Sequence, residues 1–123
     1  MTNGSNAHGV TFAQISWLNR MLTGHPNVIA VTRTNDIQFD VERGRGGPVR
    51  IVCLDEYTCS IAKVFEVCEE FPGVNLIYVG GMWNSYTGDA KRHCLEAEIG
   101  LFNTKEMSGA LHRNDFWNYV KRD

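Results

Sequence analysis

Apolar residues recur at helical or strand spacing along the chain and predict an ordered series of elements. Residues 12–23 repeat apolar side chains every three or four positions, which is typical of an amphipathic helix capped by Thr11. Three runs rich in β-branched or alternating apolar residues follow, at 27–34, 37–43 and 49–54. Short turns between these runs favour an antiparallel three-stranded meander.

The second half of the chain alternates between the two periods. The pattern predicts helices and strands in turn, over residues 58–71, 74–80, 88–97, 99–102 and 104–111. A strand–helix–strand succession normally forms a right-handed parallel crossover. The order α-β-β-β-α-β-α-β-α therefore predicts an α/β domain with three layers around a mixed sheet.

The ends of the chain differ from its centre in composition. Residues 1–9 are small and polar and predict a flexible tail, whereas residues 10–113 hold the periodic elements of a single domain. Residues 114–123 contain three aromatic side chains and a valine, so this segment is expected to dock against the domain.

Composition narrows the class of protein. The chain has 123 residues, 43% of them hydrophobic, a net charge of −2 and four cysteines without a CxxC motif. No apolar run reaches the roughly 18–20 residues of a membrane span, and the first residues do not resemble a signal peptide. The sequence predicts a soluble, cytoplasmic protein with reduced cysteines, which has no membrane partner.

Residues 75–111 form a strand, a loop, an alanine-bearing helix, a short strand and a final short helix. Small or apolar residues stand at Ala90, Ala97, Ile99, Gly100 and Leu101. Together with the element order over residues 12–111, this stretch resembles the restriction-endonuclease-like superfamily, the PD-(D/E)xK nucleases, and its Mrr-type branch. The resemblance implies a nuclease-like α/β core of α-β-β-β-α-β order plus C-terminal helices.

The resemblance also implies a catalytic site, which this sequence matches only in part. Family enzymes carry an acidic residue on the second strand, matched by Asp40, and a Glu-x-Lys or Gln-x-Lys pair on the third. Cys53 and Asp55 occupy the pair in one register, and Asp55 and Tyr57 in the other. Neither register supplies the lysine, so the motif is degenerate. An active enzyme would bind Mg²⁺ with Asp40 and Asp55, expected on one strand face, and use Lys63 as the cation. A degenerate protein needs no cofactor.

Basic residues gather in a Gly-rich hairpin in the first half of the chain. Residues 1–50 carry five basic and three acidic side chains, a sum of +2, whereas residues 51–123 carry seven and eleven, a sum of −4. Arg43, Arg45 and Arg50 surround the turn and are candidates for contacts with nucleic-acid phosphates. An exposed hairpin that arginine keeps soluble is the competing interpretation.

Aromatic residues in the loop over residues 80–88 are candidates for a partner surface. Trp83 and Tyr86 could stack on bases or anchor a protein, or fold back over the end of the sheet. The four histidines are scattered and are expected on the surface.

Three functions follow from these patterns. The first is a catalytically degenerate nuclease-like protein that recognises a nucleic acid, DNA in particular, or a protein partner. The second is an active Mg²⁺-dependent DNA endonuclease. The third is a self-associating (for instance dimeric) structural or regulatory protein, such as an inhibitor carried by a mobile element, which uses its exposed and C-terminal aromatic residues. Fold resemblance alone does not choose among them.

Overall fold

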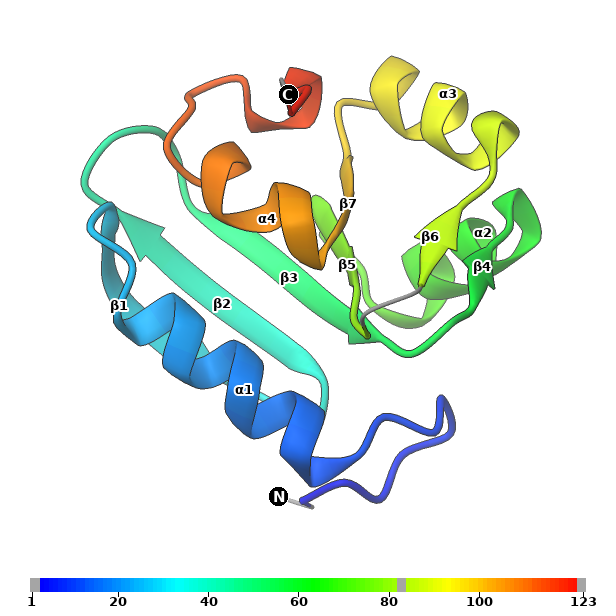
Figure 1. Cartoon of the computed structure of the whole chain (residues 1–123), viewed down its shortest axis with the longest axis horizontal. Helices are drawn as coiled ribbons and strands as arrows, with labels where there is room; N and C mark the ends of the chain where they lie inside the picture. Colours follow the sequence, from blue (N-terminus) through cyan, green and yellow to red (C-terminus); the bar gives the residue numbers. More distant parts are fainter. Residues whose placement is uncertain (1–2, 82–83, 122–123) are drawn as a thin grey trace.

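The computed structural model describes residues 3–81 and 84–121 and shows a mixed α/β architecture (Figure 1). In chain order the elements are α1 (Phe12–Thr23), β1 (Val28–Arg33), β2 (Gln38–Arg43), β3 (Val49–Leu54), β4 (Thr58–Cys59), α2 (Ile61–Glu70), β5 (Leu76–Val79), β6 (Ser85–Tyr86), α3 (Gly88–Glu96), β7 (Gly100–Asn103), α4 (Thr104–Ala110) and the 3₁₀ turn η1 (Phe116–Asn118). The predicted order of helices and long strands is confirmed, and the short strands β4 and β6 are added to it.

Five strands form one mixed sheet in the order β1-β2-β3-β5-β7. The first three pair antiparallel, as the meander predicts, and β3, β5 and β7 pair parallel. β4 and β6 pair parallel in a separate two-stranded sheet beside the carboxyl ends of these strands.

Helices cover both faces of the large sheet. α1 and α4 lie on the face turned towards the viewer in Figure 1. The crossovers β3–α2–β5 and β5–α3–β7 are of the kind that is nearly always right-handed, which places α2 and α3 together on the other face. The layers are therefore compatible with the predicted three-layer fold. Over β1 and β2 this second face has no covering helix, since Ala30, Thr32 and Glu42 are exposed.

The first helix begins as its sequence predicts. The Thr11 hydroxyl accepts a hydrogen bond from the backbone N–H of Gln14, and the Gln14 side chain accepts one from the backbone N–H of Thr11. This reciprocal capping box satisfies two of the free donors at the start of α1. Ile15, Leu18 and Leu22 then face the sheet and are fully buried.

Residues 3–9 differ from the predicted flexible tail, because polar contacts tie them to the domain. The buried Asp36 carboxylate accepts from the backbone N–H of Gly4 at 3.1 and 3.0 Å and from the Asn6 amide at 2.8 Å. His8 is also buried and pairs with Glu70 of α2 at 2.9 Å, so the expectation that His8 lies on the surface is wrong. Local composition does not reveal these partners, since they lie 30 or more residues away.

The C-terminal segment packs against α4 and β7 through Phe116 and Tyr119. Phe116 is buried, and the Tyr119 ring contacts Phe102 with ring centroids 6.2 Å apart. None of the helices in the described ranges is long and apolar enough to cross a membrane.

Candidate functional site

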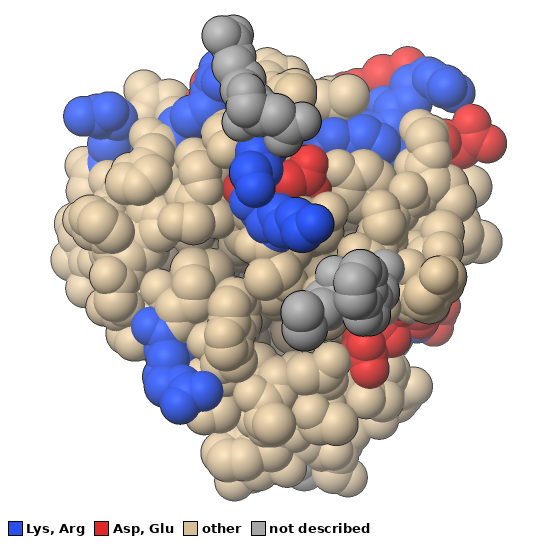
Figure 2. Space-filling model, viewed as in Figure 1, with Lys and Arg blue, Asp and Glu red and all other residues tan. Residues whose placement is uncertain are grey.

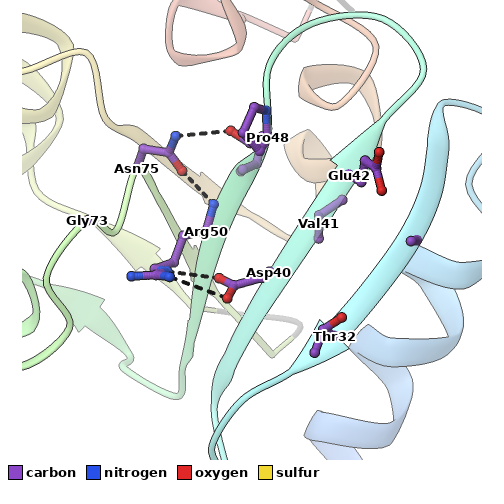
Figure 3. A pocket seen from close by; sticks show the side chains of 10 residues that line it. Thr32, Asp40, Val41, Glu42, Pro48, Arg50, Gly73 and Asn75 are labelled. Carbon is purple, nitrogen blue, oxygen red and sulfur yellow. Dashed lines mark hydrogen bonds and ion pairs between the residues drawn. The ribbon is translucent and has the colours of Figure 1, made fainter.

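Asp40 lies in a groove on the uncovered part of the sheet. This sheet groove encloses about 610 Å³ and is lined by Ala30, Thr32, Asp40, Val41, Glu42, Pro48, Val49, Arg50, Gly73 and Asn75 (Figure 3). Asp40 stands directly opposite Arg50, whose Nε donates to the Asp40 carboxylate at 2.8 Å. Arg50 also donates to the backbone carbonyl of Pro72 at 2.7 Å. The Asp40 carboxylate is thus neutralised by a guanidinium held in place, and that carboxylate in turn raises the pKa of Arg50.

The structure does not bring Asp40 and Asp55 together. Because side chains alternate along a strand, Arg50, Val52 and Leu54 share the face of Asp40. Asp55 follows the end of β3, beyond Leu54, which is about 13 Å from Arg50 along the strand. The expectation of one shared face is therefore wrong. The register of the β2–β3 hairpin determines which residues of β3 share a face with Asp40. The sequence does not fix this register, because the Gly-rich turn is long.

Cys53 and Asp55, the residues aligned with the family's catalytic pair, have different surroundings. Cys53 is fully buried next to Tyr78 of β5. Burial, with a smaller contribution from Asp55, raises the pKa of the Cys53 thiol to about 12, so it is neutral at physiological pH and offers neither a nucleophile nor a metal ligand. Asp55 is exposed and accepts a hydrogen bond from the Asn84 amide at 2.8 Å.

The raised pKa of Cys53 predicts a loss of stability at alkaline pH. The thiol ionises near pH 9 in the unfolded chain and near pH 12 in the folded protein, so its contribution is complete below pH 9 and lost between these values. Urea unfolding measures the free energy of unfolding at about pH 8 and at about pH 10. Between these two pH values, this free energy is expected to fall by about 1.4 kcal/mol more for the native sequence than for Cys53→Ala. Equal falls for both proteins would contradict this account.

Lys63 does not extend towards Asp40; it joins the N-terminal segment to α2. Its ammonium donates to His8 Nδ1 at 2.8 Å and lies 3.5 Å from both Glu56 and Glu66. Because Nδ1 accepts this bond, Nε2 of a neutral His8 carries the proton and donates to Glu70. In the described part of the chain no ion pair joins Lys63 to either candidate metal-binding aspartate.

The residues present do not fit the Mg²⁺ site that the resemblance implies. Carboxylates on one Mg²⁺ must approach within a few ångströms of each other, because Mg–O bonds are about 2.0–2.1 Å long. Asp40 instead binds Arg50, and Asp55 lies at the far end of β3. His8, Glu66 and Glu70 do place ligand atoms within 4.8 Å of one another, but the Lys63 ammonium already supplies the positive charge in this cluster.

The three arginines of the hairpin do not form one exposed cluster. Arg43 is buried, with only 5% of its surface exposed, and donates to the carbonyls of Gly47, Leu111 and Arg113. Arg50 pairs with Asp40, which leaves Arg45 as the exposed member of the three. The prediction that Arg43 contacts phosphate is wrong, because its guanidinium organises the C-terminal part of the domain.

The space-filling view agrees with this dispersal of charge. On the α1/α4 face, Lys and Arg side chains are scattered among Asp and Glu, and most of the surface is uncharged (Figure 2). The described residues of this face therefore show no continuous basic area of the kind that tracks a phosphate backbone.

The aromatic candidates of residues 80–88 have different outcomes. Tyr86 is half-buried and its hydroxyl donates to both carboxylate oxygens of Glu106 at 2.8 Å, so it is not a free partner surface. Burial and the Glu106 carboxylate raise the pKa of Tyr86. Trp83 lies outside the described residues.

A second pocket lies at the carboxyl end of β5, beneath the start of α1. This edge pocket encloses about 300 Å³ and is lined by Ala13, Gln14, Trp17, Tyr78, Gly80, Gly81 and Thr104. It adjoins Cys53 through Tyr78, the neighbour of Cys53 in the sheet. The carboxyl ends of parallel strands are where α/β sheets commonly bind ligands.

Sequence reasoning missed the edge pocket because its members come from three segments far apart in the chain. The sequence pattern predicts Gln14 and Trp17 in one helix and Tyr78 in a buried strand, and it does not indicate that these elements meet. One signal was present: Trp17 lies off the apolar stripe of α1 formed by Ile15, Leu18 and Leu22. In the structure Trp17 packs against Tyr78 and lines the pocket.

The architecture alone does not identify a relative for this chain. The element order agrees with the resemblance described above, which stays a prediction. The function must be argued from the sites themselves. Comparison with protein-family models, with curated proteins and with solved structures finds no match.

Proposed function

We propose that this protein is a catalytically degenerate, restriction-endonuclease-like protein that recognises a partner through its retained scaffold and does not hydrolyse phosphodiesters. The observation that carries the proposal is the dispersal of the three groups an active enzyme needs. Asp40 pairs with Arg50, Asp55 with Asn84, and Lys63 with His8. Each group has a structural partner of its own, which favours a scaffold function over catalysis.

The active-endonuclease alternative requires a metal site and a cation beside it. On the face of β3 that adjoins Asp40, the residues after Arg50 are the buried, apolar Val52 and Leu54. Val52 and Leu54 offer no oxygen ligand beside Asp40, which disfavours this alternative because Mg²⁺ takes oxygen ligands.

The self-association alternative relied on exposed aromatic residues. Tyr86 is bonded to Glu106, and Phe116 is buried. Tyr86 and Phe116 therefore serve the fold itself and do not support this alternative, whereas Trp83 lies outside the described residues.

A plasmid-nicking assay tests the proposal. Supercoiled plasmid is incubated with the protein and Mg²⁺ or Mn²⁺, and the relaxed product is compared with that of the double variant Asp40→Asn/Asp55→Asn. We expect equal, background levels of relaxed plasmid, because neither carboxylate can hold a metal next to the other. Nicking by the native sequence that disappears in each single variant would overturn the proposal.

A differential test uses metal-dependent stability. A bound ion raises the melting temperature in proportion to the logarithm of its concentration. We expect Mg²⁺ to shift the melting temperature of the native sequence and of Asp40→Asn equally, as a non-specific salt effect does.

A further inference from the structure

The edge pocket contains no charged side chain among its lining residues. Its walls are the aromatic rings of Trp17 and Tyr78, which lie nearly parallel, with an interplanar angle of 13° and centroids 6.2 Å apart. Trp17 is 40% exposed. An uncharged pocket with an exposed flat ring on its wall favours a planar, uncharged ligand that stacks on that ring.

Hydroxyl groups on one side of the pocket present hydrogen-bond acceptors. The Thr104 hydroxyl donates to the carbonyl of Gly81 at 3.3 Å, so the Tyr78 hydroxyl is the donor in its 2.9 Å bond to Thr104. Both donor hydrogens are thereby used, and lone pairs of the Tyr78 and Thr104 oxygens remain.

Gln14 presents hydrogen-bond donors. Its Oε1 accepts from the backbone N–H of Thr11 at 2.8 Å and from the Thr11 hydroxyl at 3.1 Å. The capping box thus fixes the orientation of the Gln14 amide, with Oε1 bound to Thr11 and Nε2 on the opposite side of the group. Within residues 3–81 and 84–121, Nε2 has no hydrogen-bond partner, and both of its N–H groups are available to a ligand.

We propose that the edge pocket binds an uncharged heteroaromatic ring of nucleobase size, which carries a carbonyl and an N–H group on one edge. The ring stacks on Trp17, its carbonyl accepts from Gln14, and its N–H donates to the Tyr78 or Thr104 oxygen. A cavity of about 300 Å³ suits one such ring, at the lower end of ligand pockets. This inference rests on the proposed recognition function and specifies its ligand. The same ring chemistry is found in a free nucleoside and in an unpaired base of a single strand.

Calorimetric titration with uridine tests the proposal. A second titration with hexathymidylate tests binding of a base within a single strand. We expect saturable binding of uridine, and binding at least about fivefold weaker for Trp17→Ala, the range for loss of one stacking partner. Gln14→Glu keeps an oxygen for the capping box but removes the N–H donors, and it is expected to weaken binding as well. 3-Methyluridine, which lacks the ring N–H, is expected to bind more weakly than uridine to the native sequence.

The matched control is Phe65→Ala on α2, which removes an aromatic ring that is 52% exposed and lies outside the pocket. It is expected to bind uridine as the native sequence does. If hexathymidylate binds and Trp17→Ala weakens that binding, the ligand is a base within a strand. If uridine binds, the ligand is a free nucleoside. Binding of neither, or binding that Trp17→Ala and Gln14→Glu leave unchanged, would overturn the inference. The plasmid assay is independent of this titration. If the protein nicked plasmid and also bound uridine in the edge pocket, the proposed function would be wrong and the inference about the ligand would stand.

Discussion

Replacing Arg43 by Met lowers the free energy of unfolding by about 3 kcal/mol, whereas replacing Arg45 by Met changes it by less than about 0.5 kcal/mol. Arg43 donates to three backbone carbonyls, those of Gly47, Leu111 and Arg113, at 2.9, 3.2 and 2.7 Å. Its guanidinium also lies 5.2 Å from the ring centre of Phe116. Met fills a similar volume but leaves these carbonyls without a donor.

Urea unfolding of the two variants measures this difference. Arg43 and Arg45 lie two positions apart in the same hairpin, so the two substitutions have the same effect on net charge and a similar effect on the unfolded chain. Burial lowers the pKa of Arg43, but a guanidinium remains charged at neutral pH, so loss of the charge-assisted bonds dominates. If both variants lost the same stability, the buried hydrogen bonds of Arg43 would not be holding the C-terminal segment.

Replacing Asp36 by Ala lowers the unfolding free energy by about 2–3 kcal/mol and releases residues 3–9 from the domain. The buried Asp36 carboxylate accepts bonds from Gly4 and Asn6 and pairs with Arg33 at 3.3 Å. Removal of the carboxylate leaves these donors unpaired at a site only 5% exposed. Urea unfolding measures the first effect, and limited proteolysis followed by mass spectrometry measures the second.

Asp40→Ala is the matched control for this variant. Asp40 also pairs with an arginine, but both partners are more than 30% exposed, and such half-exposed pairs contribute less than about 1 kcal/mol. We expect residues 3–9 to stay protected in Asp40→Ala. Equal proteolysis of the two variants would show that Asp36 does not anchor the segment.

The sequence predicted the elements of this fold well because their periods are local properties. The alternation of Ile37, Phe39 and Val41 set the inward face of β2, and the capping residue Thr11 marked the start of α1. The same alternation places Arg43 inward, so its burial could have been predicted if the pattern had been weighed above the usual exposure of arginine.

The candidate site was less predictable, because it depends on partners far apart in the chain. The pairing of Asp40 with Arg50 depends on hairpin register, and that of Lys63 with His8 joins residues 55 positions apart. Period and composition carry no information about such pairs. The resemblance supplied positions for a catalytic site, but not the polar partners that engage its members individually.

The anchoring of residues 3–9 also sets an order of events during synthesis. His8 is synthesised before its partner Glu70, which is added more than 60 residues later. At about 5–20 residues per second, several seconds pass before both sides of the contact exist. Residues 3–9 therefore reach their final place only after the helix that holds His8 has been made.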